Sequence, residues 1–175
     1  MPTIITHPFT ALLKTWWPSV PKRAVPAGVV MTVLPDADVV AFMFGIPYQH
    51  MLGHRGITHS IAFAVLVALL GTAMLRVPAH RRTTFTFLFI CAISHPLLDA
   101  LTNGGLGVAL FAPFHNERYF FPWTPIRVSP IGAAFFTPRG FATLISEMQW
   151  VWLPAAILAL AGRHLRHARS GAAGS

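Results

Sequence analysis

The sequence predicts an all-α membrane protein whose helices form about four membrane segments. Hydrophobic residues make up 54% of the 175 residues and charged residues only 10%, whereas soluble globular domains carry about 25% charged residues. The apolar residues fall in stretches near the roughly 20 residues that a bilayer-crossing helix needs, and short basic groups separate these stretches. These observations disfavour the alternative, a very apolar soluble protein. We expect one helical domain over residues 1–170 and a disordered tail at 171–175.

The first apolar stretch, residues 24–46, is interrupted by the motif LPDAD at 34–38. Pro35 disrupts a regular helix, and the two aspartates are costly in lipid unless they have partners. Irregular backbone at membrane depth is tolerated where it faces the protein interior. The motif therefore predicts a first segment that is broken or re-entrant at LPDAD.

Three further stretches predict the other segments. Residues 57–77 form the clearest one, and residues 84–101 follow after a short turn. Residues 148–162 are fewer than the roughly 20 that cross a bilayer core, so partial crossing remains an alternative. The intervening region 102–147 is rich in glycine, proline and aromatic residues, which suits a loop layer at the membrane interface.

The basic residues indicate an orientation, because cytoplasmic loops of membrane proteins carry more Lys and Arg than external loops. With both termini cytoplasmic, nine of the 13 basic residues lie inside and four lie outside. The nine are Lys14, Lys22, Arg23, Arg76, Arg81, Arg82, Arg163, Arg166 and Arg169, and the four are Arg55, Arg118, Arg127 and Arg139. The net charge of +8 is too scattered to predict a nucleic-acid partner. No cleaved signal peptide is expected at the amino terminus.

Acidic residues are rare, and three of the five, Asp36, Asp38 and Asp99, lie within or at the edge of apolar segments. An ionisable group at membrane depth is expensive and therefore indicates a functional site. The alternatives are salt bridges, or helix capping by Asp36 or Asp38.

His95 and Asp99 are four residues apart in the sequence SHPLLD. On a helix these positions share a face, so the imidazole and the carboxylate can bind one ion. A simple buried ion pair between them is the alternative.

The sequence HRGITHS at 54–60 adds His54 and His59 at the mouth of the second segment. We expect its helix to begin near Thr58, a plausible N-cap. Arg55 between the histidines is a candidate for binding a phosphate or another anion, with anchoring at lipid headgroups as the alternative.

These residues are predicted to meet. If the second and third segments pair antiparallel, the start of one lies beside the end of the other, which brings His59 next to His95 and Asp99. Asp36 and Asp38 can approach from the broken helix. Imidazole and carboxylate ligands suit zinc first, with manganese and iron as alternatives. One or two ions would activate water and stabilise charge on a phosphoryl or acyl oxygen.

Three motifs, taken in their order along the chain, resemble those of the YdjM-type bacterial inner-membrane proteins. These proteins are described as LexA-regulated, membrane-bound, metal-dependent hydrolases. The motifs are LPDAD at 34–38, GHRGITHS at 53–60, and SHPLLDALTNGG at 94–105 followed by FAPF; THPF near the start and SE at 146–147 resemble weaker elements. The resemblance covers about residues 5–130. It implies metal ligands at His7, Asp36, Asp38, His54, His59, His95 and Asp99, with Thr58, Ser60 and Thr102 orienting them.

The order of the histidines and aspartates is also similar to that of zinc-dependent phospholipase C and P1-type nucleases. Without their later His/Glu set, a trinuclear centre is not expected. The resulting hypothesis is a hydrolase of phospholipids or other phosphoesters, with membrane lipids as partners. Asp38 serves as general base or bridging ligand, a role that Asp36 could also take, and Arg55 as the anion-binding residue. The alternatives are a non-catalytic membrane protein that uses metal for structure or partner recruitment, and an ion transporter.

Overall fold

The computed structural model describes residues 1–130 and 132–172. Its elements are η1 (His7–Trp16), α1 (Ala24–Val33), η2 (Leu34–Phe44), η3 (Ile57–His59), α2 (Ile61–Leu75), η4 (Pro78–His80), α3 (Arg81–Ala100), η5 (Gly132–Phe136), α4 (Pro138–Glu147), η6 (Met148–Trp152) and α5 (Leu153–Ala172). Within these described ranges there are two isolated β-bridges and no strands. The all-α prediction is confirmed.

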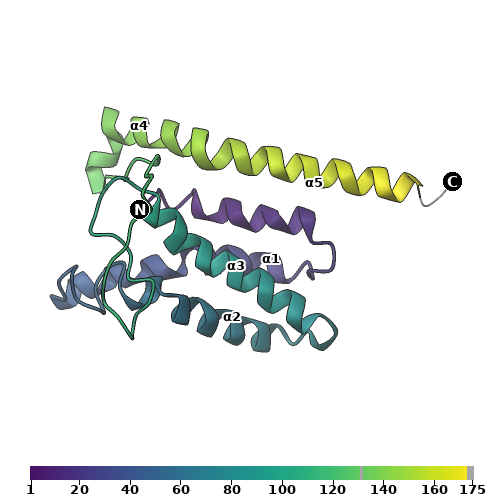
Figure 1. Cartoon of the computed structure of the whole chain (residues 1–175), viewed down its shortest axis with the longest axis horizontal. Coiled ribbons are helices and arrows are strands. Elements are labelled where there is room, and N and C mark those ends of the chain that lie inside the picture. The colour runs from purple at the N-terminus through teal and green to yellow at the C-terminus, as the bar shows by residue number, and fades with distance from the viewer. Residues whose placement is uncertain (131, 173–175) are drawn as a thin grey trace.

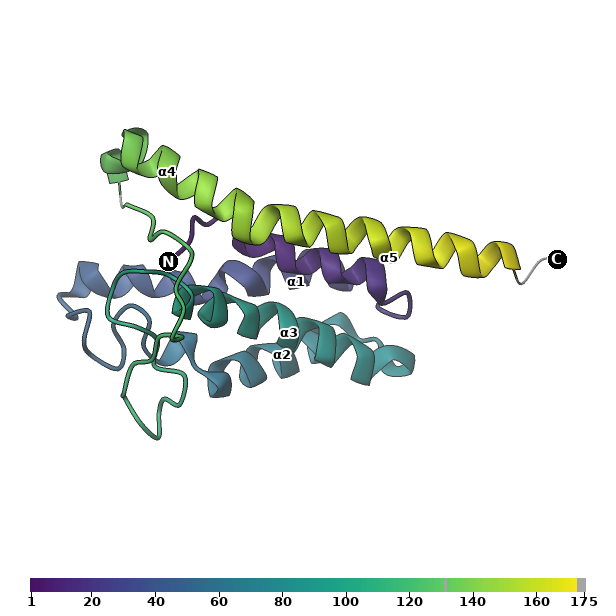
Figure 2. The ribbon, with the colours of Figure 1, turned by 45° about the horizontal axis from the view of Figure 1, so that its top comes forward.

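The helices lie alongside one another in an elongated bundle (Figures 1 and 2). η1 runs from the amino-terminal end to the opposite end, α1 and η2 return, and α2 and α3 form an antiparallel pair. α3 packs against α1, α2 and η1. Small residues allow this close packing: a Cβ on Gly28 of α1 would lie 2.7 Å from Phe87 Cε1 of α3. Cys91 is a free, buried residue of the same core, as its apolar surroundings indicated.

Three helices are long and apolar enough to cross a membrane, by length and composition: Ala24–Phe44, Pro78–Ala100 and Pro138–Arg166. Only 33%, 50% and 17% of their most apolar windows are buried inside the protein, so their outer faces suit contact with lipid tails. α2 is apolar but has only 15 residues. The structure therefore supports a helical membrane protein, while the count of about four segments is not confirmed.

The second segment is shorter than expected because its helix begins later. Ile57–His59 form a separate 3-10 turn, and α2 starts at Ile61. Ser60 is its N-cap and accepts a hydrogen bond from the Phe63 backbone N–H at 3.1 Å. The prediction of Thr58 as the N-cap is wrong; the Thr58 hydroxyl donates to Asp38 instead.

The LPDAD motif changes the type of helix and does not turn the chain back. α1 passes directly into the 3-10 helix η2 at Leu34, and together they form one span of 21 residues. Pro35 lies in the first turn of η2, where its missing N–H is tolerated. At LPDAD the first segment thus continues as a tighter 3-10 helix where a break was expected. The re-entrant alternative is wrong.

The last segment is longer than residues 148–162, because α4, η6 and α5 form one continuous helix. α4 (Pro138–Glu147) falls within residues 102–147, which were predicted to be a loop region, and that prediction is wrong for this helix. η6 is a π-helix, whose wider turn brings residues five apart closer to one face. α5 includes residues 171–172 of the predicted disordered tail, and residues 173–175 lie outside the described residues.

Charges separate along the bundle. The turns between η1 and α1 and between α2 and α3 lie at the end toward which α5 runs (Figure 1), and we call this the basic end. Arg23 Nη2 donates to the Arg76 carbonyl there at 3.2 Å. Burial lowers the pKa of Lys14, and nearby Arg166 and Lys22 lower it further. The opposite end, where α3 finishes, we call the site end.

The two ends of the chain lie toward opposite ends of the bundle (Figures 1 and 2). The cytoplasmic side expected for both termini stays a prediction, but their places in the bundle differ. The reason is η1, which carries the chain from the site end to the basic end before α1 begins.

Candidate metal centre

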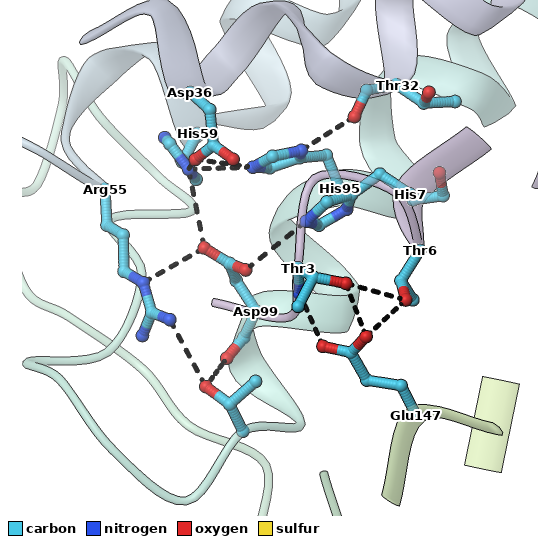
Figure 3. A network of polar contacts seen from close by, with 12 residues as sticks. Thr3, Thr6, His7, Thr32, Asp36, Arg55, His59, His95, Asp99 and Glu147 are labelled. Atoms are coloured by element: carbon cyan, nitrogen blue, oxygen red, sulfur yellow. Dashed lines mark hydrogen bonds and ion pairs between the residues drawn. The ribbon is translucent and has the colours of Figure 1, made fainter. Parts of the chain in front are cut away.

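Four side chains from separate segments converge at the site end: Asp36 from η2, His59 from η3, and His95 and Asp99 from α3 (Figure 3). Each residue is at most 7% exposed. His59 Nε2 lies 3.1 Å from His95 Nε2, 3.7 Å from Asp36 Oδ1 and 3.5 Å from Asp99 Oδ2. His95 Nε2 lies 3.3 Å from Asp36 Oδ1.

These separations suit four ligands around one ion. Zinc binds nitrogen and oxygen at about 2.0–2.2 Å, so tetrahedral ligand atoms lie about 3.3–3.6 Å apart; the observed distances are close to this range. The carboxylate oxygens of Asp36 and Asp99 are buried and have no hydrogen-bond partner. Buried carboxylates without hydrogen bonds are costly. Arg55 offsets part of this cost at Asp99 Oδ2, and a cation between the two carboxylates would offset more of it. The donor set therefore fits a divalent metal.

His95 is oriented as a ligand by the backbone where α1 changes into the 3-10 helix η2. Its Nδ1 lies 2.7 Å from the Thr32 carbonyl, which can only accept, so Nδ1 carries the proton and the Nε2 lone pair faces the cluster. In the 3-10 pattern the N–H of residue 35 would bond to this carbonyl. Pro35 has no N–H, which leaves acceptor capacity on Thr32 for His95.

Asp38 belongs to a second group of possible ligands with His54 and His59. Its Oδ1 lies 2.7 Å from His54 Nδ1, and its Oδ2 accepts from Thr58 Oγ1 at 2.6 Å and from the Arg55 backbone N–H at 3.1 Å. Oδ2 also lies 3.1 Å from His59 Nδ1. Asp38 is thus satisfied within the protein. This arrangement favours a carboxylate that orients a histidine ligand over one that binds metal directly.

Neither LPDAD aspartate caps a helix through its side chain, because Asp36 accepts no hydrogen bond and Asp38 pairs with residues 54, 55 and 58. The capping alternative is therefore wrong for both. The contrast between them is chemical: Asp36 has two buried oxygens without hydrogen bonds, whereas Asp38 accepts several.

Metal affinity should separate the two aspartates. Asp36→Asn is expected to remove most of the bound metal, while Asp38→Asn is expected to weaken affinity by only about 10–100-fold, as the loss of an outer partner does. Competition with a zinc chelator, on protein purified in detergent, measures both. Glu117→Gln is the matched control, because Glu117 is an exposed carboxylate next to Arg118, which donates to the His54 carbonyl. A larger loss in Asp38→Asn than in Asp36→Asn would contradict the assignment.

His7 lies beside the four converging side chains. Its ring stacks on His95 with the centroids 3.8 Å apart, and its Nε2 is 3.9 Å from Asp99 Oδ1. Both ring nitrogens are buried without hydrogen-bond partners. His7 thus lies next to the four converging side chains but belongs to neither group of possible ligands, and its role as a metal ligand stays a prediction.

Arg55 is buried in the site, with only 1% exposed, so the headgroup-anchor alternative is wrong. Its Nε lies 3.0 Å from Asp99 Oδ2 as an ion pair, its Nη1 donates to the Gly104 carbonyl at 3.0 Å, and its Nη2 donates to Thr102 Oγ1 at 3.2 Å. Gly105, at φ +89°, allows this approach, because a Cβ there would lie 2.9 Å from Arg55 Nη1. The guanidinium is thus engaged with the protein and holds Asp99 in place.

Tyr48 and Arg118 cover His54 and were not predicted. The Tyr48 ring stacks on His54 at 5.2 Å, and the Arg118 guanidinium lies 5.3 Å from the centre of the Tyr48 ring. Arg118 also donates to the carbonyls of His54 and Tyr48 at 2.9 and 2.8 Å. Burial raises the pKa of the Tyr48 hydroxyl, which therefore stays protonated at neutral pH. Neither residue has a spacing that points to the site from sequence.

Glu147 was missed as a site residue, although SE at 146–147 was its signal. It is fully buried at the end of α4 and accepts hydrogen bonds from the Thr3 backbone, the Thr3 hydroxyl and the Thr6 hydroxyl (Figure 3). Trp152, across the π turn, donates to the same Thr6 hydroxyl at 2.7 Å. These contacts hold the segment that leads into His7.

The fold and the site define a helical membrane protein with a buried His/Asp cluster that could hold a metal ion. The chain belongs to the YdjM inner membrane protein family, whose model matches residues 3–169. It is 42% identical over 166 residues to the inner membrane protein YbcI of Escherichia coli (strain K12), covering 90% of this chain and 95% of that protein. No solved structure matches the chain.

Proposed function

We propose that this protein is a membrane-embedded, metal-dependent hydrolase of phosphoesters, with a membrane phospholipid or a lipid-linked phosphoester as substrate. The observation that carries the proposal is the convergence of Asp36 and Asp99 oxygens, which have no hydrogen-bond partner, with two histidine Nε2 atoms at distances that suit a shared cation. Zinc is the first candidate for this donor set.

The residues of the chain take distinct roles in this proposal. Asp36, His59, His95 and Asp99 hold the metal, and Asp38 and the Thr32 carbonyl orient the two histidine rings. Arg55 fixes Asp99 by their ion pair. This assigns Asp38 a positioning role in place of the general base. A bound metal would supply an activated water and stabilise charge on the phosphoryl oxygens.

The surroundings of the site suit a lipid substrate. Asp36, Asp38 and His54 are 6–8% exposed, whereas His59, His95 and Asp99 are fully buried, so the accessible side is that of η2 and the following loop. Val39, Val40, Phe42 and Met43 of η2 are 42–83% exposed. A lipid lying against this apolar face would present its phosphate beside Asp36.

The charges favour one orientation. Since cytoplasmic loops of membrane proteins are rich in Lys and Arg, we assign the basic end to the cytoplasmic face of the inner membrane. The site end then faces the other side. An external label on a cysteine introduced at exposed Glu117 would test this, because labelling only after membrane disruption would contradict it.

One observation favours a second candidate, a metal used for structure. Four protein ligands complete a tetrahedral zinc site, whereas catalytic zinc keeps a position open to water or substrate. The near-complete burial of the four ligands agrees with a closed site. In that case the ion stabilises the contact of η2 and η3 with α3.

A hydrolase would turn over a phospholipid substrate, whereas a protein with a structural metal would not. Protein purified in detergent is analysed for bound metal and then incubated with mixed phospholipid micelles, with released phosphorylated headgroup as the readout. For a hydrolase, we expect wild-type and Glu117→Gln protein to release headgroup. Asp36→Asn should lose more than the roughly 10–100-fold that an outer partner costs. Bound metal without release above the Asp36→Asn rate would support the structural candidate, and no bound metal would contradict both.

A further inference from the structure

Within residues 1–130 and 132–172, no acidic side chain lies at the basic end. Its cations include Lys14, Lys22, Arg23, Arg76, Arg81, Arg82 and Arg163. The chain has five acidic residues, Asp36, Asp38, Asp99, Glu117 and Glu147, and the structure places all of them at the site end. An anionic partner from outside the chain can therefore balance these cations, and the leaflet that meets this end supplies anionic headgroups.

Two hollows at the basic end flank Arg81, where α2 ends and α3 begins. Their volumes are about 310 and 300 Å³, and both are lined by Thr72 and Arg81. Ala73, Arg76, Val77 and Pro78 complete the first, and Leu69, Arg82 and Phe85 complete the second. We call these two hollows the α2–α3 notch.

The α2–α3 notch combines a cationic rim with apolar walls. Arg76, Arg81 and Arg82 are exposed on the rim, and guanidinium groups bind phosphate oxygens in paired hydrogen bonds. Leu69 is 51% exposed on the wall, and Leu66, one turn earlier on α2, is 52% exposed. An apolar strip thus leads from the rim along the outside of α2.

We propose that the α2–α3 notch is a binding site for an anionic phospholipid. The phosphate lies among Arg76, Arg81 and Arg82, and one acyl chain follows Leu69 and Leu66 along α2. This site is separate from the metal centre, which lies at the other end of the bundle (Figure 1), and it does not depend on hydrolase activity.

Arg76 allows a test that leaves the fold intact. It is the C-cap of α2 and has φ 49°, a left-handed conformation that favours glycine over any residue with a side chain. Arg76→Gly therefore removes a cation from the notch without straining the backbone. Its carbonyl, which accepts from Arg23, remains.

The experiment measures lipid binding to the full chain in a neutral detergent. Short-chain phosphatidylglycerol is titrated against wild type, Arg76→Gly, Arg81→Gln/Arg82→Gln and a matched control, Lys22→Gln/Arg163→Gln. The control removes the same charge from the same end but outside the notch. Each notch cation is expected to change the affinity for phosphatidylglycerol about fivefold. The affinity of Arg81→Gln/Arg82→Gln should therefore fall about thirtyfold and that of Arg76→Gly about fivefold. The control should lose less than about twofold.

Two further titrations identify the ligand. Phosphatidylcholine tests the need for net negative charge, and inorganic phosphate tests the need for an acyl chain. Both should bind at least about tenfold more weakly than phosphatidylglycerol. Equal losses in the notch and control variants, or equal binding of either probe, would overturn the proposal. Thermal unfolding of Arg76→Gly at or above the wild-type temperature shows that a binding loss is not a folding loss.

Discussion

Asp99→Asn is expected to abolish metal binding and to destabilise the protein at the same time. Asp99 faces His59 at 3.5 Å and Arg55 at 3.0 Å. Asparagine cannot supply the charge that a cation needs there. It also leaves the Arg55 guanidinium buried without its counter-ion, which typically costs about 3–5 kcal/mol. Elemental analysis and thermal unfolding in detergent measure the two effects.

A double variant separates these effects. Arg55→Met/Asp99→Asn removes the buried charge together with its partner, and replacing both members of a buried pair by uncharged groups is often close to neutral. We expect it to regain at least half of the lost stability and still bind no metal. Glu117→Gln serves as the control for loss of an acidic residue. Stoichiometric metal in Asp99→Asn would show that Asp99 is not a ligand.

Glu147→Ala is expected to cause the second large effect, on the segment that carries His7. The substitution leaves three buried donors from Thr3 and Thr6 without their acceptor. An unsatisfied buried group costs about 1–3 kcal/mol, so a total loss of about 3–5 kcal/mol is expected. Glu147→Gln retains one acceptor oxygen and should lose less.

The position of His7 provides the readout for Glu147. His7 is fully buried in the wild type, and release of the preceding residues should expose it. Chemical modification of His7 by diethylpyrocarbonate, followed by mass spectrometry, should be at least about tenfold faster in Glu147→Ala, since a group buried at 0% becomes accessible. His115, which is exposed, is the internal reference. Unchanged modification of His7 would show that Glu147 does not hold this segment.

The sequence predicted the cluster of histidines and aspartates because few folds can bury so many polar groups in an apolar chain. The positions of His59, His95 and Asp99 followed from the antiparallel pairing of two helices. The residue types and motif order also indicated Asp36 and Asp38, and the comparisons confirm the family to which these motifs pointed. The composition and the length of the apolar stretches were enough for the helical class.

Other features depend on contacts that sequence does not display. The different roles of Asp36 and Asp38 follow from which side chains reach each carboxylate, and both share one motif. The burial of Arg55 depends on Gly105, about 50 residues away. Ser60 rather than Thr58 caps α2, because the adjacent 3-10 turn shifts the start of the helix. The pairing of Glu147 with Thr3 joins positions 144 residues apart.

That last contact has a consequence for biosynthesis. Residues 3–7 leave the ribosome long before their partners Glu147 and Trp152, which belong to the helix formed by α4, η6 and α5. Until that helix inserts, His7 lacks the support that positions it against His95. A nascent chain arrested before residue 138 should therefore hold its earlier helices yet present an unfinished ion site, so that maturation of the site becomes one of the last steps of assembly.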